Sequence, residues 1–201
     1  MEYQVGAEGI DTAPVQTHLS PTLTTRAMIA RALIALTLLA SFGRAQTPPS
    51  ATSQARMLWQ GVRRNVSAAA EEGSETLYSY RPTVEVRTFG QLLAHVAGSE
   101  KMFCAMSLGE KPGAEDQVEK TAMSKAAIVA ALKESYSYCN RAYAQSDAAT
   151  AASIEMFGET RTKLFALMMN AAHDDEHYGN LVTYMRLNKL VPPSSRPTPP
   201  K

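Results

Sequence analysis

Apolar residues recur at intervals of three and four along most of the chain after residue 50, which is the spacing of one face of an α-helix. Four such segments are separated by turn-forming or polar stretches. We expect helices over about residues 53–74, 89–108, 124–143 and 157–188. No segment alternates apolar and polar residues as a strand does. The pattern therefore predicts an all-α fold, a four-helix bundle.

The same pattern predicts which side chains face the core. For the first helix they are Met57, Leu58, Val62 and Val66. For the second helix they are Phe89, Leu92, Leu93, Val96 and Phe103, and for the third Ile128, Leu132, Tyr136, Cys139 and Tyr143. Thr88 and Ser124 are suited to cap the second and third helices, and Gly109 to end the second.

Residues 1–45 are expected to be an amino-terminal extension that ends in a signal peptide. The apolar run AMIARALIALTLLA contains and follows arginines, and Gly43 and Ala45 stand where a signal peptidase reads small residues. Met28 would also make a compact start. The run is short for a membrane span, although an uncleaved anchor helix is the alternative. We therefore expect cleavage after Ala45, no stable membrane anchor afterwards, and an exported, periplasmic protein.

Composition limits the rest of the chain. The 201 residues are 45% hydrophobic, which suits a single domain, and we divide them into a linker at 46–52, the bundle at 53–190 and a proline-rich tail at 191–201 that should pack as neither helix nor sheet. The formal net charge is +1, and no basic run is interleaved with aromatic residues. Nucleic acid is therefore not expected as a partner.

The stretch HDDEHYGNLVTY places two histidines four residues apart in the fourth predicted helix. His173 and His177 share an apolar, inward face, and side chains at this spacing lie about 6 Å apart, which suits two imidazole ligands of one metal ion. His95 can point inward from the second helix at a matching level, whereas the remaining histidine, His18, lies before the expected cleavage site. These three histidines are our candidate metal ligands, and the alternative for each is a core histidine bonded to a backbone carbonyl.

The stretch has two other interpretations. HDDEH matches the HxxEH motif of inverted zinc proteases, with Glu176 as general base, but only 24 residues follow His177, too few to supply the third ligand from a distant helix. Alternatively, Asp174, Asp175 and Glu176 form a solvated face, from which an acid such as Glu176 orients a ligand imidazole. Tyr184 could orient a bound ligand, or could simply bond to a backbone carbonyl.

The four-helix layout, the histidine in LLAHVAGSE and the HxxxH of HDDEHYGNLVTYMRLNKLVPPSS resemble the DinB superfamily of DinB/YfiT-like metalloenzymes, over about residues 53–195. The resemblance implies that His95, His173 and His177 bind a divalent ion such as zinc, nickel or iron and leave coordination positions open. It also implies chemistry related to thiol S-transferases that use bacillithiol or mycothiol. Such thiols are scarce outside the cytoplasm, which argues against that activity in an exported protein.

The resemblance further implies an up-down-down-up bundle, in which the second and third helices are parallel. Cys104 and Cys139 then lie about fifteen residues into their helices, at equal height, and we expect a disulfide between them. In an antiparallel arrangement they would be roughly 16 Å apart along the axis and would remain two buried thiols.

The sequence is consistent with two functions. The first is a metal-dependent enzyme, of hydrolase or thiol S-transferase type, that acts on an unknown small-molecule substrate. The second is a non-catalytic metal-binding or stress-response bundle in which the ion only joins two helices. Three histidine ligands favour the first and a closed site with four protein ligands the second. A homodimer is left open.

Overall fold

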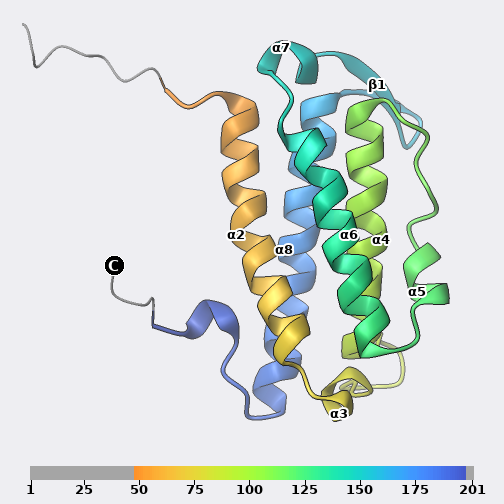
Figure 1. Cartoon of the computed structure of the whole chain (residues 1–201), viewed down its shortest axis with the longest axis vertical. Coiled ribbons are helices and arrows are strands. Elements are labelled where there is room, and N and C mark those ends of the chain that lie inside the picture. Colours follow the sequence, from red (N-terminus) through yellow and green to blue (C-terminus); the bar gives the residue numbers. More distant parts are fainter. Residues whose placement is uncertain (1–47, 198–201) are drawn as a thin grey trace, which may run out of the picture. The chain divides into compact units, whose positions relative to one another are not determined.

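The computed structural model describes residues 48–197, which form a bundle of four long helices (Figure 1). They are α2 (Ala51–Glu72), α4 (Phe89–Leu108), α6 (Lys125–Tyr143) and α8 (Lys163–Leu187). Helices α2 and α8 run in one direction and α4 and α6 in the other, so the predicted up-down-down-up bundle is confirmed. The expected signal peptide, Met28 and His18 lie outside the described residues. No helix within 48–197 has the length and apolar character needed to span a membrane.

The long helices begin where a hydroxyl side chain can accept a backbone N–H. The caps are Ser50, Thr88, Ser124 and Thr162, each accepting from the residue three positions on. At α4 the cap is reciprocal, because the Gln91 side chain also accepts from the Thr88 N–H. Gly109 ends α4 in the left-handed region, at φ 77°, a conformation that glycine adopts without strain. The predicted caps of α4 and α6 are confirmed.

The predicted core faces of α4 and α6 are buried, and so are Val62 and Val66 of α2, but the prediction that Met57 and Leu58 face the core is wrong. Met57 and Leu58 are 57% and 70% exposed, whereas Trp59 is buried. The indole of Trp59 stacks on Tyr143 and donates its N–H to Glu100, and these contacts place Trp59 on the inward face of the first half of α2. Burial of one large aromatic side chain with a polar partner stabilises the fold more than burial of two smaller apolar side chains, so Trp59 faces the core.

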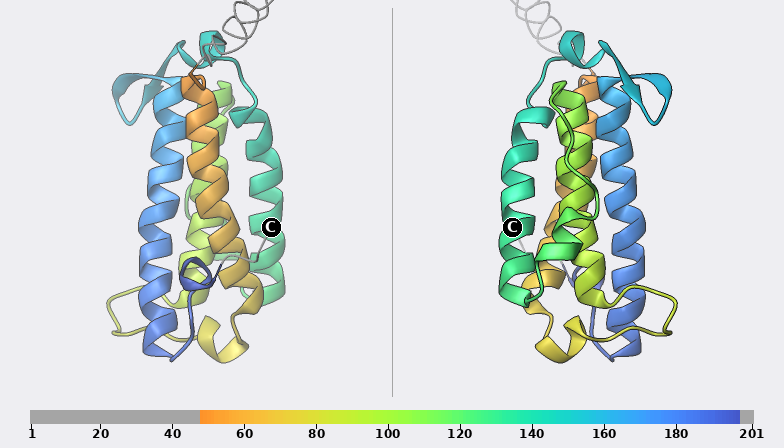
Figure 2. Two further views of the ribbon diagram at one scale, coloured as in Figure 1. Left: turned by 90° about the vertical axis from the view of Figure 1, so that its left-hand side faces the viewer. Right: turned by 90° about the vertical axis from the view of Figure 1, so that its right-hand side faces the viewer.

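Short helices and a hairpin lie in the connections between the long helices, where we expected loops or the start of the fourth helix. They are α3 (Glu75–Tyr78), α5 (Gln117–Thr121) and α7 (Asp147–Thr150), and a hairpin of β1 (Ser153–Met156) and β2 (Glu159–Thr162). The hairpin strands are antiparallel, and Phe157 and Gly158 between them have φ values of 54° and 80°, as a two-residue hairpin turn requires. The prediction of no strands and of a helix from residue 157 is therefore wrong. Figure 2 shows the hairpin at the end of the bundle where α8 begins.

The two predicted boundary segments also differ from the structure. Helix α2 begins at Ala51, inside the segment expected to be a linker. Part of the proline-rich tail packs back as the 3-10 helix η1 (Pro193–Ser195), where Ser194 donates its N–H to the Tyr178 hydroxyl at 2.9 Å. Arg196 then forms an ion pair with Glu72 of α2. Prolines fix the turn geometry here without preventing the tail from packing.

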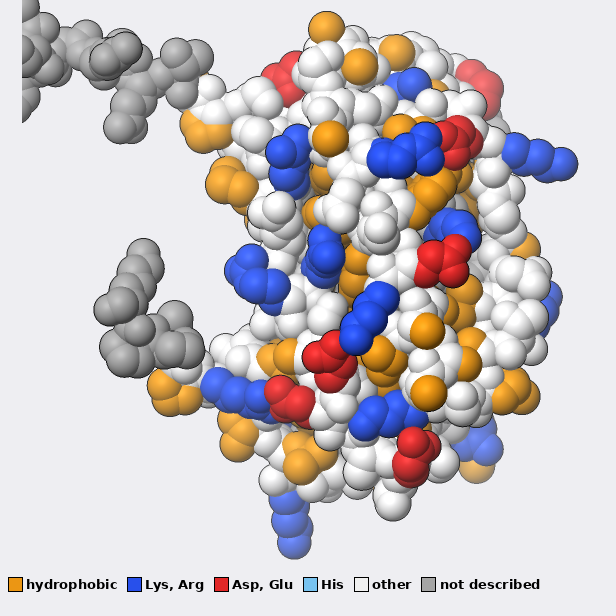
Figure 3. Space-filling view, in the orientation of Figure 1, with side chains coloured by type: hydrophobic (Ala, Val, Ile, Leu, Met, Phe, Trp, Pro, Cys, Tyr) orange, Lys and Arg blue, Asp and Glu red, His pale blue; other side chains and the backbone are white. Residues whose placement is uncertain are grey.

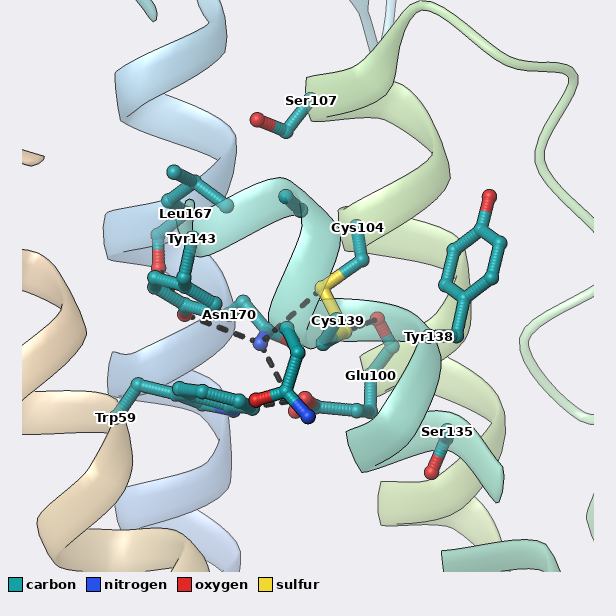
Figure 4. The surroundings of a disulfide bond; sticks show 12 residues. Trp59, Glu100, Cys104, Ser107, Ser135, Tyr138, Cys139, Tyr143, Leu167 and Asn170 are labelled. Atoms are coloured by element: carbon teal, nitrogen blue, oxygen red, sulfur yellow. Dashed lines mark hydrogen bonds between the residues drawn. A yellow bond between two sulfur atoms is a disulfide. The ribbon is translucent and has the colours of Figure 1, made fainter. Parts of the chain in front are cut away.

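A disulfide joins Cys104 of α4 to Cys139 of α6, with the Cα atoms 5.4 Å apart and both residues fully buried (Figure 4). Beside it, a polar network crosses the bundle. Trp59 of α2 and Asn170 of α8 donate to the two oxygens of Glu100 at 2.7 and 2.8 Å. Asn170 also contacts the Tyr143 hydroxyl at 3.2 Å. We call Trp59, Glu100, Tyr143 and Asn170 the buried network; its bonds fix α2, α4, α6 and α8 in one register.

Acidic and basic side chains are interspersed on the face of the bundle that Figure 3 shows. Surface ion pairs contribute to this mixture, among them Lys133 with Glu71 at 3.0 Å between α6 and α2. Exposed pairs of this kind each contribute little to stability, so the core and the buried network hold the helices together.

Candidate metal centre

The three predicted histidines meet between α4 and α8. His95 lies two turns into α4, and His173 and His177 face it from the middle of α8, which runs antiparallel to α4. The Nε2 atom of His173 is 3.3 Å from that of His95 and 3.1 Å from that of His177. Each of the three residues offers a ring nitrogen within 4.8 Å of those of the other two. The spacing that motivated the prediction therefore yields a compact cluster of imidazoles.

Hydrogen bonds between the imidazoles cannot satisfy this cluster. The Nε2 atom of His173 carries either one proton or one lone pair, so it serves two neighbouring nitrogens only by sharing it. A metal ion would accept all three lone pairs at once. With bonds of about 2.0 to 2.1 Å, a tetrahedral ion requires nitrogen–nitrogen separations of about 3.3 to 3.4 Å. The two observed separations are close to that value, so the residues fit a divalent cation.

Burial keeps these imidazoles neutral, which is the form that binds metal. It lowers the pKa of His95 to about 3, with the Arg87 guanidinium and the other two histidines adding to the effect. The pKa of His173 falls to about 4 for similar reasons, burial first and His177 next. Burial also lowers the pKa of His177, although Glu176 opposes the shift. At neutral pH the three imidazole rings therefore do not have to lose a proton before they bind a cation.

The Nδ1 nitrogens of the three histidines have weaker contacts than the Nε2 nitrogens. The Nδ1 atoms of all three histidines are buried without a hydrogen-bond partner within residues 48–197. The nearest acid to one of them is Glu119, whose Oε2 lies 3.9 Å from Nδ1 of His95. Glu119 is mainly engaged by Arg87, at 3.1 Å. Carboxylates commonly orient metal-bound imidazoles through the second ring nitrogen, and among the described residues no carboxylate forms a good hydrogen bond of this kind.

A pocket of about 490 Å³ opens beside His177. Its walls combine apolar, acidic, basic and amide side chains: Glu85, Val86, Arg87, Leu92, Asn180 and Tyr184. The Tyr184 hydroxyl donates to the Arg87 carbonyl at 2.9 Å, so it holds the loop before α4 in place. The pocket therefore reaches one histidine of the cluster, His177, from the side of that loop.

The acids of the HDDEH stretch do not form one solvated face. Asp175 and Glu176 are exposed, and no hydrogen bond joins Glu176 to a histidine among the described residues. Asp174 is fully buried, and no protein donor faces its carboxyl oxygens within residues 48–197. Burial and the nearby Glu100 raise the pKa of Asp174 well above its usual range. A protonated Asp174 can then donate to Glu100, which extends the buried network by one residue.

The sequence analysis missed one residue at the cluster. The linker after α4 carries Glu115, whose Oε1 lies 3.5 Å from Nε2 of His95 and 3.6 Å from Nε2 of His173. Glu115 belongs to a polar stretch with several acids, EKPGAEDQVEK, in which nothing distinguishes it from its neighbours. Only the packing of the linker onto α4 identifies it.

Comparisons with known proteins agree with this fold. The chain is similar to a DinB-like protein from Bacillus cereus, at 15% identity and a TM-score of 0.61, over 69% of this chain and 93% of that one. It is also similar to a mycothiol-dependent maleylpyruvate isomerase, at 17% identity and a TM-score of 0.56, over 65% of this chain and 60% of the isomerase. No curated protein matches. A sequence model of the DinB superfamily matches residues 58–181, well over half of the chain. The chain therefore belongs to the DinB superfamily.

Proposed function

We propose that this protein is a metal-dependent enzyme in which His95, His173 and His177 hold a divalent ion such as zinc, nickel or iron. The observation that carries the proposal is the convergence of three neutral imidazoles, with Nε2 separations of 3.1 and 3.3 Å. A bound ion would act as a Lewis acid and lower the pKa of a coordinated water or thiol. The adjoining pocket would hold a small-molecule substrate, with Arg87 as its cationic group.

The reaction type within this proposal is a hydrolysis or a thiol S-transfer. One structural relative is named for its dependence on mycothiol, although at 17% identity this likeness extends to the fold alone. We also propose that the protein is exported and periplasmic. The apolar run before Ala45 supports export, and so does the buried disulfide, because such bonds persist in oxidising compartments.

The second candidate function is a non-catalytic bundle in which the ion joins α4 to α8. The observation in its favour is the carboxylate of Glu115, which lies close enough to two of the histidines to act as a fourth protein ligand. A closed site of four protein ligands is the usual pattern of structural zinc.

Catalysis by the loaded protein separates the two functions. The protein would be freed of metal, loaded in turn with Zn²⁺, Ni²⁺ and Fe²⁺, and assayed with activated esters and with thiol-plus-electrophile pairs. We expect turnover with at least one ion and none in the metal-free protein or in His177→Ala. A loaded protein that melts at a higher temperature but turns over none of these substrates would favour the structural role.

A further inference from the structure

The linker between α4 and α6 is pressed onto α4 next to His95. A side chain at Gly98 would place its Cβ only 1.9 Å from the Glu115 carbonyl oxygen, so only glycine lets the linker backbone lie there. Gly98 follows His95 by one helical turn, on the same side of α4. The linker is thereby held where the Glu115 side chain can reach the histidine cluster.

The Glu115 carboxylate faces two histidines at once. Its Oε1 atom is 3.5 Å from Nε2 of His95 and 3.6 Å from Nε2 of His173, and those two nitrogens are 3.3 Å apart. These distances are too long for good hydrogen bonds to the oxygen. They are close to the edge of about 3.3 to 3.4 Å between ligands of one tetrahedral ion. Oε1 thus lies beside the edge between the His95 and His173 nitrogens, at a ligand-like separation from both.

No other cation accounts for this position. Within residues 48–197, no Lys or Arg lies within ion-pair distance of Glu115, whereas its neighbours are paired: Asp116 with Lys120 at 2.6 Å, and Glu119 with Arg87 at 3.1 Å. A carboxylate that has no basic partner and lies beside the Nε2 atoms of His95 and His173 is placed to bind a cation held between them.

We propose that Glu115 is the fourth ligand of the ion held by the three histidines. This inference rests on the proposed function, because it requires that the histidines bind metal. The Glu115 side chain is 43% exposed and belongs to the linker, outside the four long helices. A substrate that coordinates the ion must therefore displace a carboxylate from a surface segment and need not disturb the bundle.

The test uses Co²⁺ and azide with the parent, Glu115→Ala and Asp116→Ala. Asp116→Ala is the matched control, because it removes the neighbouring acid of the same linker. We expect Glu115→Ala to bind one Co²⁺ per chain with an affinity at least about 10-fold weaker than the parent, and to bind azide at the ion about 10-fold more tightly. The control should remain within about 3-fold of the parent in both measurements.

Each outcome decides the inference. If Glu115→Ala binds Co²⁺ as tightly as the parent, Glu115 is not a ligand, whatever happens to azide. If Co²⁺ binding weakens and azide affinity is unchanged, Glu115 acts on the site without filling the fourth position, and the inference is also wrong. Failure of the proposed function looks different, because the parent itself would then bind no Co²⁺, or His173→Ala would bind it equally well.

Discussion

The histidine cluster and the buried network both contain residues of α4 and α8. The two regions differ in where the partners of their polar atoms come from. In the buried network, both oxygens of Glu100 face protein donors, from Trp59 and Asn170, and the side chains are sealed from solvent. In the histidine cluster, three ring nitrogens face one another, and His173 remains partly exposed. In the first region the chain itself supplies the donors for the Glu100 carboxylate, and these bonds stabilise the fold. The second region could hold a cation, which is the arrangement of a functional site.

Removal of the central acid of the buried network should have the largest effect on stability. Glu100→Ala leaves the Trp59 and Asn170 donors without an acceptor, and we expect the free energy of unfolding to fall by about 3 to 5 kcal/mol. Urea unfolding measures this. Glu134→Ala is the control, because Glu134 pairs with Lys101 at the surface, and it should cost less than about 1 kcal/mol. Similar losses in the two variants would show that the network is not structural.

The disulfide should come next. It closes a loop with a sequence separation of 35 residues, so Cys104→Ala with Cys139→Ala should lower the free energy of unfolding by about 4 kcal/mol. Unfolding of the parent in dithiothreitol should approach the behaviour of this double variant. Metal stoichiometry should stay unchanged, because neither sulfur belongs to the histidine cluster. A parent insensitive to dithiothreitol would mean that the bond is absent.

The histidine cluster should make the metal-free protein sensitive to acid. The pKa values of His95 and His173 in the folded protein are about 3 and about 4, below the ordinary value of 6.5, so the unfolded chain binds more protons between these limits. The free energy of unfolding should therefore be highest above pH 6.5 and fall as the pH drops toward 4, by up to about 1.4 kcal/mol per pH unit for each histidine. Urea unfolding across this range measures the slope. His95→Gln should make it shallower; an unchanged slope would contradict the shifted pKa of His95.

The smallest effect is expected at Tyr184. Its hydroxyl bonds to the Arg87 carbonyl, so Tyr184→Phe should cost about 1 kcal/mol of stability. Zn²⁺ affinity should remain within about 2-fold of the parent, because the hydroxyl is already engaged by the loop before α4. A large loss of metal affinity without a loss of stability would instead assign Tyr184 the role of orienting a bound ligand.

The sequence predicted what depends on local periodicity and capping. The caps Thr88 and Ser124, the core faces of α4 and α6, and the inward face shared by His173 and His177 follow from spacing along one helix. The burial of Trp59 in place of Met57 and Leu58 does not follow from spacing, because it depends on a contact between Trp59 and Glu100, which are 41 residues apart. Asp174 was read as solvated for the same reason, since its burial beside Glu100 is a property of the packed bundle.

The candidate site shows the same limit. Three histidines could be chosen because the fourth, His18, precedes the expected cleavage site. Glu115 could not, because its position depends on a linker backbone that lies against Gly98, and the sequence of that linker contains several equivalent acids. Long-range packing, which has no local signature, separates the predicted residues from the missed ones.

Zinc titration of the metal-free protein, with and without the central histidine, tests the account most directly. His173 lies within 3.3 Å of both other histidines, so His173→Ala removes the nitrogen that the cluster shares. The parent should bind one Zn²⁺ per chain in isothermal titration calorimetry, and His173→Ala should bind at least about 100-fold more weakly while retaining the helical circular dichroism of the parent. A folded His173→Ala protein that binds one Zn²⁺ as tightly as the parent would contradict the three-histidine centre.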